Sequence, residues 1–573
     1  MIKSNINRRN GVMISVRNLN RPDKGKLDNI SLDIMPGEMV AIIGGSGAGK
    51  TTLLDAISGY SKVGKSRVFY SGMDISKHPE YLKKAVGYVP QSDIVHMNLT
   101  VYEMLNYTAR LRLSQDFSKI KRLSRVDEAL KMTKLKEHAN TTVRKLSGGQ
   151  RKRASIAMEL LADPTVLFLD EPTSGLDHNT EEELINSLRE IADTYSKTMV
   201  LVTHTTDFLA KFDKVIILGK DGKLCYFGHA DNITAYFDVE SIPDVYKKLE
   251  VLEEAEHWKK KYNDRRPQLK VLPKCNIEEV EAVEISGAAW GTQLRALTSR
   301  YAKLTLTRFL ESKLKFSSLW LLPLIFGVVL GFIVGEKLYK EFSVTQVVSL
   351  IMACFGMWIG LFTGITQVSV ERSILRREGK ANMKISAYIT SKVIVLSVVS
   401  VVQTMLLFFI YWFMCTISST NMPTRHLTGL LPWPENWVTV ELVCLSSITL
   451  GLCLSSFSRN PEGIAPYVLM LQIILPGVLL VLPEILDKMK IISCTYWGNR
   501  ALCASADINE IGWLSAYNQF GDRIASEVFK RRDDYIPELS NLLDCWKNLA
   551  IIFIAPIFLS LIGLKLIVIN NER

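Results

Sequence analysis

The chain has 573 residues, a formal net charge of +11, and 48% apolar residues. This length exceeds what one compact core holds, so at least two domains are expected. The apolar residues concentrate in the second half, and Lys and Arg cluster beside its apolar runs as in membrane proteins, so the positive charge does not indicate a nucleic-acid partner.

The N-terminal segment and the cysteines bear on location. Residues 1–15 lack the apolar run of a signal peptide, so the first domain is expected to stay in the cytosol. The nine Cys residues are too scattered for a disulfide framework or a zinc cluster. Cys494, Cys503 and Cys545 fall in a segment expected outside the membrane, where oxidation is chemically allowed.

The first half has the pattern of an α/β domain. Between residues 11 and 230, short β-rich runs such as MVAIIG and TVLFLD alternate with amphipathic stretches, which predicts a mainly parallel sheet. The segment AIIGGSGAGKTT fits the G-x-x-x-x-G-K-T phosphate loop of P-loop NTPases between a strand and a helix. Its backbone N–H groups are expected to hold ATP phosphates, with Lys50 charging the β and γ groups and the Thr51 hydroxyl ligating Mg²⁺. The predicted ATP-binding residues of the loop are Gly44, Gly45, Ser46, Gly47, Ala48, Gly49, Lys50, Thr51 and Thr52.

Two acidic residues follow the next strong strand. The apolar residues Val166–Leu169 end in Asp170 and Glu171, at the carboxyl edge of the sheet where α/β ligands bind. We assign Asp170 to Mg²⁺ through water and Glu171 to the general base that aligns the attacking water. Such a pair alone would more often cap a helix. The upstream phosphate loop favours the catalytic assignment.

Two further polar residues are weak signals alone. His204 follows the strand MVLVT, where it could hydrogen-bond the γ-phosphate or the water, or be an ordinary surface histidine. Gln91, in YVPQSD, would usually be a loop amide.

The segment Leu146–Gln150 reads LSGGQ, and with it the whole first domain resembles the ATPases of ABC transporters. Ser174–Asp177 (SGLD) looks like the family's D-loop, His204 matches its switch histidine, and Gln91 matches its Q-loop, a ligand of ATP and its metal. The resemblance implies that Ser147 and Gly149 contact the γ-phosphate held by a second subunit. A dimer would then be obligatory.

One departure from this family concerns the adenine. Residues 1–59 contain no Phe, Trp or Tyr, although the family usually stacks the base on an aromatic residue there. Either Arg17 or an apolar residue such as Val16 or Leu19 covers the base, or base selectivity is relaxed.

The rest of the chain is predicted to be a linker and a membrane domain. Residues 231–290 are charged and helical in character, and Trp290–Leu310 has the pattern of an amphipathic surface helix. Residues 291–573 are expected to form an all-α domain of six spans with one large external loop, 484–547. The predicted spans are 319–334, 344–368, 393–415, 438–457, 464–482 and 549–569.

The loop between the second and third spans, ERSILRREGKANMKISAYITSK, is rich in Arg and Lys and is therefore expected in the cytoplasm, like the first domain. It is also a candidate contact that transmits ATP-driven closure to the spans, through Glu371, Arg372 and Arg376. A solvated loop that only sets topology would look the same.

The order of domains, together with NLTVYEML and the ERSILRREG loop, is similar to white-type half-transporters of the ABC G subfamily, whose membrane domains are of the ABC-2 type. The resemblance covers nearly the whole chain. Sequons of the N-x-S/T type are absent from the expected external loops, which favours a bacterial source and hence the plasma membrane.

The spans contain few ionisable residues, which argues against a proton relay and favours a hydrophobic or amphipathic cargo. Residues of the second and fifth spans could line a cavity at the dimer axis, although such side chains more often pack or face lipid. The candidates are Phe355, Trp358, Phe362, Met470 and Gln472.

The sequence thus predicts a dimeric, ATP-hydrolysing half-transporter that exports or flips a lipid, peptide or drug-like molecule, with ATP and Mg²⁺ as cofactors. A homodimer is favoured, and a heterodimer with another half-transporter stays open. The alternative is a membrane lever that uses ATP to move a partner or extract a lipid without translocating cargo.

Overall fold

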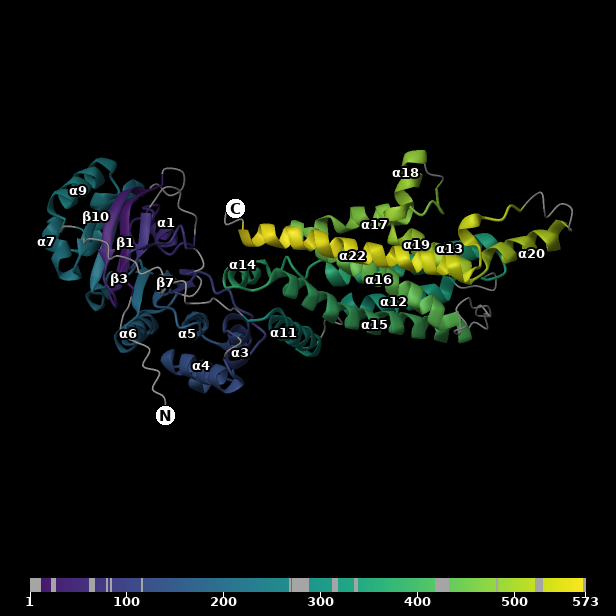
Figure 1. Cartoon of the computed structure of the whole chain (residues 1–573), viewed down its shortest axis with the longest axis horizontal. Helices are drawn as coiled ribbons and strands as arrows, with labels where there is room; N and C mark the ends of the chain where they lie inside the picture. Colours follow the sequence, from purple (N-terminus) through teal and green to yellow (C-terminus); the bar gives the residue numbers. More distant parts are fainter. Residues whose placement is uncertain are drawn as a thin grey trace. The chain divides into compact units, whose positions relative to one another are not determined.

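The computed structural model contains two compact units, which are coloured along the chain in Figure 1. The N-terminal unit comprises Met1–Ala296 with Lys380–Met383, and the helical unit comprises Leu297–Gly379 with Lys384–Arg573. The described residues are 12–21, 27–60, 67–78, 81–82, 85–114, 117–266, 269, 288–311, 318–333, 338–417, 432–480, 483–520 and 529–569.

The N-terminal unit is built on a sheet with the strand order β5-β4-β1-β2-β10-β9-β3-β8-β7-β6. From β9 through β6 neighbouring strands pair in parallel, whereas β1 pairs antiparallel with β2 and β4. The predicted parallel sheet is therefore confirmed for the strands that carry the motifs. The strands are β1 (Ile14–Arg21), β2 (Leu27–Ile34), β3 (Met39–Gly44), β4 (Arg67–Tyr70), β5 (Met73–Asp74), β6 (Val86–Val89), β7 (Val166–Asp170), β8 (Thr198–Val202), β9 (Lys214–Gly219) and β10 (Lys223–Gly228).

Helices cover both faces of this sheet, which explains why its central strands are apolar throughout. In β3, Met39, Ala41 and Ile43 belong to one hydrophobic cluster, while Val40 and Ile42 belong to another. Alternate side chains point to opposite faces of a strand, so both faces of β3 are buried. The helices before residue 230 are α1 (Lys50–Ile57), α3 (Val101–Arg112), α4 (Lys119–Met132), α5 (Gly148–Leu160) and α6 (His178–Tyr195), with short 3₁₀ turns at Lys136–His138, Val143–Lys145, Leu209–Lys211, Lys220–Gly222 and Ala230–Asn232.

The predicted linker 231–290 differs from the structure in its first half. Helices α7 (Ile233–Phe237), α8 (Ile242–Leu249) and α9 (Leu252–Arg265) place Phe237 and Trp258 in the same cluster as β3. Their charged faces suggested a linker, but one buried stripe suffices to pack an amphipathic helix on a core. Residues 267–268 and 270–287 lie outside the described residues.

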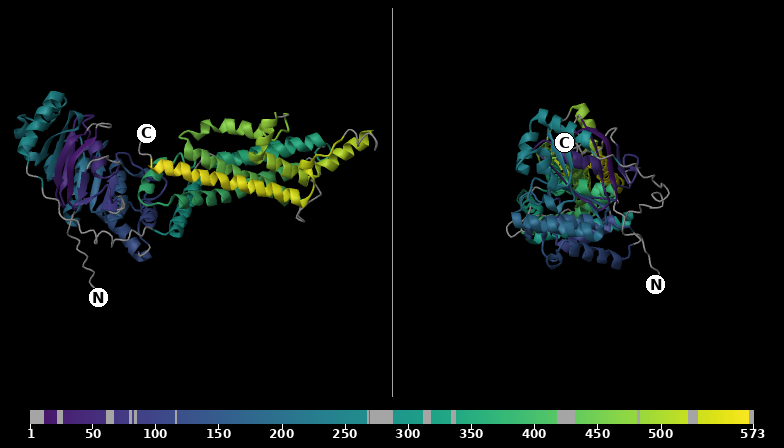
Figure 2. Two further views of the ribbon diagram at one scale, coloured as in Figure 1. Left: turned by 45° about the horizontal axis from the view of Figure 1, so that its top comes forward. Right: turned by 90° about the vertical axis from the view of Figure 1, so that its left-hand side faces the viewer.

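The helical unit consists of long helices that lie side by side (Figure 2). Within it, α16 packs against α13, α15, α19 and α22. The elements are α11 (Trp290–Glu311, which begins in the N-terminal unit), α12 (Ser318–Ile333), α13 (Phe342–Gly364), α14 (Arg372–Lys380), α15 (Ile385–Ile417), α16 (Pro432–Phe457), α17 (Ala465–Ile474), α18 (Glu484–Met489), α19 (Cys494–Ser505), α20 (Ile508–Phe520) and α22 (Leu539–Ile569), with 3₁₀ turns at Pro461–Gly463, Lys490–Ile492 and Asp533–Tyr535.

Four helices in the described part of the chain are long and apolar enough to cross a membrane: α13, α15, α16 and α22. Two further apolar helices are shorter: Leu321–Ile333, within α12, and Pro461–Ile474, which overlaps the fifth predicted span. The fifth span was predicted as 464–482, but its helix α17 ends at Ile474, and residues 481–482 lie outside the described residues.

Glycines allow α13 and α16 to approach closely. A Cβ at Gly360 would lie 2.2 Å from the carbonyl oxygen of Cys444, and one at Gly364 would lie 2.4 Å from that of Ile448. Small residues one turn apart are a common way to pack membrane helices backbone to backbone.

The segment 484–547, predicted as an external loop, is largely helical. Its helix α19 is buried along most of its length and packs against α13, α16 and α22. Cys494, Cys503 and Cys545 are free and buried, so the structure does not pair them.

Candidate functional site

The phosphate loop connects β3 to α1. Three glycines of the loop have φ values that residues with a Cβ rarely adopt: 155° at Gly44, 74° at Gly47 and 90° at Gly49. A Cβ at Gly44 would also lie 2.4 Å from the carbonyl oxygen of Leu218 on β9. The loop therefore requires glycine where the motif has it.

Lys50 begins α1 and is folded back over this loop. Its ammonium donates hydrogen bonds of 2.9 Å to the carbonyl oxygens of Gly44 and Gly45. Burial lowers the pKa of Lys50, and the carboxylates of Glu171 and Asp170 oppose that shift. The side chain is thus held in the loop, where an incoming phosphate can replace the carbonyl partners.

Asp170 ends the buried strand β7 beside Thr51, whose hydroxyl donates to Asp170 Oδ1 over 3.2 Å. Burial raises the pKa of Asp170 to about 6, although the Thr51 hydrogen bond opposes this shift. A hydroxyl and a carboxylate next to a phosphate loop are hard oxygen ligands of the kind that Mg²⁺ takes, so the residues present fit this ion.

Glu171 contacts two other residues of the predicted site. Its Oε2 accepts a 2.8 Å hydrogen bond from the Gln91 amide, and its Oε1 lies 2.7 Å from His204 Nε2. The Glu171 backbone has φ 45°, a left-handed conformation that side chains seldom adopt. Three strand ends, β6, β7 and β8, thereby bring their polar residues to one edge of the sheet.

Lys152 is a residue at this edge that the sequence analysis missed. It lies on α5, is 4% exposed, and its ammonium donates to the carbonyl oxygen of Gln91 and lies 3.4 Å from Asp93 Oδ1. It therefore holds the segment that carries Gln91. Lys152 lies between Arg151 and Arg153, so no signal in the sequence set it apart.

The signature segment has local partners in the single chain. Ser147 caps α5: its hydroxyl accepts from the Gln150 N–H over 3.2 Å, and the Gln150 side chain accepts from the Ser147 N–H. A Cβ at Gly149 would lie 2.3 Å from Cγ2 of Thr180, so Gly149 permits close packing of α5 on α6. None of the contacts described for Ser147 involves the phosphate loop.

Two of the three residues offered for adenine contact are buried. Val16 and Leu19 are 0% exposed in the core beneath β1, and Arg17 is bound to Asp33 at 2.7 Å. The apolar alternatives are therefore wrong, because a buried side chain cannot cover a base.

The predicted cavity residues of the helical unit fall into two groups. Phe362 and Met470 are exposed in the single chain. Residues that line a cavity between two copies would be exposed in this way. Phe355 is buried and stacks on Phe326 with ring centroids 4.1 Å apart, and Trp358 lies 5.4 Å from the same ring.

Gln472 was predicted to line this cavity but is buried. Its side-chain oxygen accepts from the Ser493 hydroxyl over 2.9 Å, and its backbone oxygen accepts from Thr495. It thus ties α17 to the start of α19 through hydrogen bonds to its side-chain and backbone oxygens.

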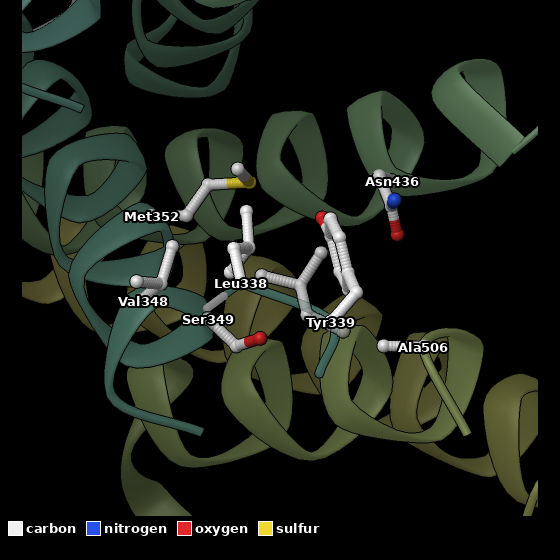
Figure 3. Close-up of a pocket in the computed structure, with 8 residues that line it drawn as sticks. Leu338, Tyr339, Val348, Ser349, Met352, Asn436 and Ala506 are labelled. Carbon is white, nitrogen blue, oxygen red and sulfur yellow. The ribbon is translucent and has the colours of Figure 1, made fainter. Parts of the chain in front are cut away.

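A different hollow lies between α13, α16 and α19 (Figure 3). The hollow is small, with about 10 Å³ for the centres of water-sized molecules, and Asn436 and Ser349 place polar groups among apolar walls. None of the predicted cavity residues lines it. The lining residues are Leu338, Tyr339, Val348, Ser349, Met352, Asn436, Leu502 and Ala506.

The residues predicted for coupling turn largely inward. Glu371 is 6% exposed and lies 2.6 Å from Lys392 on α15, and its carboxylate accepts from the Tyr388 hydroxyl over 3.0 Å. Arg376 donates to the carbonyl oxygen of Ile567 on α22 over 3.3 Å, and Arg372 is partly buried. Glu371 is therefore part of the interior of the helical unit.

The fold and the site define a P-loop ATPase domain joined to a helical membrane domain. A family model described as "ABC transporter" matches residues 27–174, and one described as "ABC-2 type transporter" matches residues 292–505. Together they cover more than half of the chain, which belongs to the ABC transporters.

Among known proteins, the chain is similar to the ABC transporter ATP-binding/permease protein Rv1747 of Mycobacterium tuberculosis, with 32% identity over 85% of this chain and 56% of that protein. It is 40% identical to ABC transporter G family member 22 of Arabidopsis thaliana over 38% of this chain and 29% of that protein. It therefore spans about half the length of the first relative and less than a third of the second. A solved structure, cbiO1 from Clostridium perfringens, shares 28% identity over 42% of this chain and 98% of that one, with a TM-score of 0.36.

Proposed function

We propose that this chain is a half-transporter of the plasma membrane that hydrolyses ATP in the cytoplasm to export or flip a hydrophobic or amphipathic molecule. The observation that carries the proposal is the convergence of Gln91 and His204 on Glu171, beside the Thr51–Asp170 pair and the phosphate loop.

The residues divide the work of hydrolysis. The loop amides and Lys50 bind the phosphates and offset their charge. Glu171 accepts a hydrogen bond from the attacking water and aligns it, while His204 and Gln91 fix the carboxylate in place. The His204 side chain is exposed and would also hydrogen-bond the γ-phosphate of bound ATP.

Thr51 and Asp170, with Gln91, would hold Mg²⁺, which supplies positive charge against the phosphate oxygens. Protons compete with the ion for Asp170, because binding requires the ionised carboxylate. The apparent Mg²⁺ affinity in the presence of ATP is therefore expected to fall about tenfold for each pH unit below about 6, the value to which burial raises the Asp170 pKa.

Isothermal titration of the ATP-bound protein with Mg²⁺ at several pH values measures this dependence. Asp170→Asn should weaken Mg²⁺ binding and remove the part of its pH dependence that is assigned to this carboxyl. Without Mg²⁺, the contribution of Asp170 to folding stability changes with pH in the opposite direction to the Mg²⁺ affinity. Because the pKa of Asp170 is raised from 3.8 to about 6 in the folded protein, this carboxyl stabilises the fold below about pH 4, and the contribution is lost as the pH rises through 6. A Mg²⁺ affinity that stays flat across this window contradicts the assignment.

A second subunit would complete the site. Ser147 and Gly149 lie at the N-terminus of α5, where N–H groups and the helix dipole favour a phosphate, and their contacts within the chain leave that role to a partner's ATP. A homodimer is proposed, because all elements of one ATP site are present in this chain.

Complementation tests the dimer. Chains with Lys50→Ala and chains with Ser147→Arg should each be inactive, whereas a co-expressed mixture contains dimers with one intact phosphate loop facing one intact signature. The mixture should recover ATPase activity above the sum of the separate variants. A mixture no better than that sum would refute the shared site.

The cargo class is tested by ATPase activity in lipid nanodiscs. Wild type is expected to hydrolyse ATP without another protein, and one class among lipids, amphipathic peptides and drug-like molecules should stimulate it. Phe362→Ala and Met470→Ala should reduce the stimulation without lowering the basal rate, since the Phe362 side chain is exposed on α13 and the Met470 side chain is exposed on α17. A wild type that binds ATP but stays silent with every cargo would overturn the homodimer.

A further inference from the structure

A buried carboxyl group, Glu441, joins two membrane helices. It lies on α16, about 12 Å along the helix from Trp433 by the rise of 1.5 Å per residue. Its side chain is 7% exposed. Ser400 Oγ lies 2.6 Å from Oε1 and Thr404 Oγ1 lies 2.7 Å from Oε2, both on α15. The ATP site makes no use of this group.

The helices around Glu441 supply no nearby cation in the described residues. α12 and α13 contain no Asp, Glu, Lys or Arg, and the one basic residue of α15, Lys392, lies two turns from Ser400 and is bound to Glu371 at 2.6 Å. The other ionisable groups of α16 and of the helices packed on it are carboxyls, thiols, phenols and three bases, and no ion pair joins Glu441 to any of these bases in the described part of the chain. They are Glu435, Cys444 and Cys453 on α16, Cys354 on α13, Tyr388, Tyr411 and Cys415 on α15, Cys494, Tyr496, Arg500 and Cys503 on α19, and Asp544, Cys545, Lys547 and Lys565 on α22.

An ionised Glu441 would therefore be an unpaired charge inside a membrane bundle. Such a charge costs several kcal/mol, whereas a neutral acid needs only hydrogen bonds. The energetic argument favours a bound proton.

The hydroxyl protons around the carboxyl allow the same conclusion. The Ser400 hydroxyl lies 2.9 Å from the Ser397 carbonyl oxygen, and the Thr404 hydroxyl lies 3.0 Å from that of Ser400. Each hydroxyl has one proton, so a hydroxyl that donates to its own helix needs a proton from the acid for its contact to Glu441. The neutral acid supplies one such proton, so one hydroxyl, here Ser400, donates to the carboxyl oxygen while Thr404 donates to its own helix. Thr404 Oγ1 also accepts from Trp437 Nε1 over 3.1 Å and has a second lone pair for the acid proton.

We infer that Glu441 is a proton-binding site of the membrane domain, neutral in this conformation, which fastens α16 to α15 by donating its proton to a hydroxyl. When the seam between these helices opens to water, the carboxyl can ionise. The site therefore links proton release to separation of α15 from α16. This inference concerns the helical unit alone and stands or fails independently of the cargo.

Infrared spectroscopy of the full chain in nanodiscs tests it directly. The C=O stretch of a protonated carboxyl lies apart from carboxylate and amide bands. Glu441→Gln should remove one such band at neutral pH. Glu484 is an exposed carboxylate that pairs with Lys488, so Glu484→Gln should remove none. A spectrum of Glu441→Gln with all protonated-carboxyl bands of wild type would overturn the inference.

Thermal unfolding gives a second readout that does not need the band to be assigned. Raising the pH to alkaline values should lower the melting temperature of wild type and Glu484→Gln more than that of Glu441→Gln, because glutamine mimics the neutral acid and cannot ionise. Equal pH dependence of all three proteins would contradict a titrating Glu441. If Glu441→Gln does not fold, the wild-type spectrum still tests the inference. One protonated-carboxyl band should disappear at alkaline pH, and the double variant Ser400→Ala with Thr404→Val should shift that same band. If no band responds to alkaline pH and to the double variant, the inference is wrong.

Discussion

Replacing Glu171 by glutamine is expected to lower the ATP hydrolysis rate about 100-fold or more while leaving ATP binding intact. Glutamine keeps the shape of the side chain and can still accept from Gln91 and face His204, so the site geometry should survive. It loses the negative charge that orients the attacking water. Turnover and nucleotide affinity, measured on the same preparation, separate the two effects.

Glu183→Gln is the matched control, because this carboxylate lies on α6, pairs with Arg153 and has a side chain 70% exposed. It should leave both quantities within about twofold, as expected of a surface ion pair. Hydrolysis that persists in Glu171→Gln at a similar level would show that another group aligns the water.

Replacing Lys392 by methionine is expected to lower the free energy of unfolding by about 3–5 kcal/mol, the usual cost of leaving one buried charge without its partner. Lys392 is 1% exposed, contacts Glu371 at 2.6 Å, and lies 3.9 Å from the Tyr301 ring centroid. The remaining Glu371 carboxylate would then have lost its nearest cation.

Two comparisons sharpen this test by thermal unfolding in nanodiscs. Lys488→Met breaks an exposed ion pair of 2.8 Å and should cost under about 1 kcal/mol. Adding Glu371→Gln to Lys392→Met should recover part of the loss, because both buried charges are then gone. If Lys392→Met is as stable as wild type but uncouples ATPase activity from cargo, the pair belongs to a moving contact instead.

The meeting of the proposed ATP-site residues at one sheet edge was predictable because the motifs are short and Gln91, Glu171 and His204 each follow a strand end. The edge of a parallel sheet brings such residues together whatever lies between them, and Gln91, Glu171 and His204 do converge. What the spacing could not give was the left-handed backbone of Glu171 or the bond from Lys152 to the Gln91 carbonyl, since both depend on packing between distant segments.

The helical unit was predicted less well because charged and polar segments were assumed to be exposed to solvent. The Arg- and Lys-rich loop suggested solvent, yet Glu371 and Glu378 are buried through pairing with Lys392 and Arg300, the latter at 2.6 Å. Gln472 is satisfied by hydroxyl groups of a segment that composition assigned to an external loop. Pairing partners far apart in sequence decided these cases.

ATP-dependent movement of a fluorescent amphipathic probe across the bilayer of proteoliposomes, with this chain as the sole protein, tests the central claim most directly. The account predicts movement by wild type that requires both ATP and Mg²⁺ and that Glu171→Gln abolishes. ATP hydrolysis that is stimulated by the probe, with no movement of it across the bilayer, would contradict a transporter and leave an ATP-driven lever that translocates nothing.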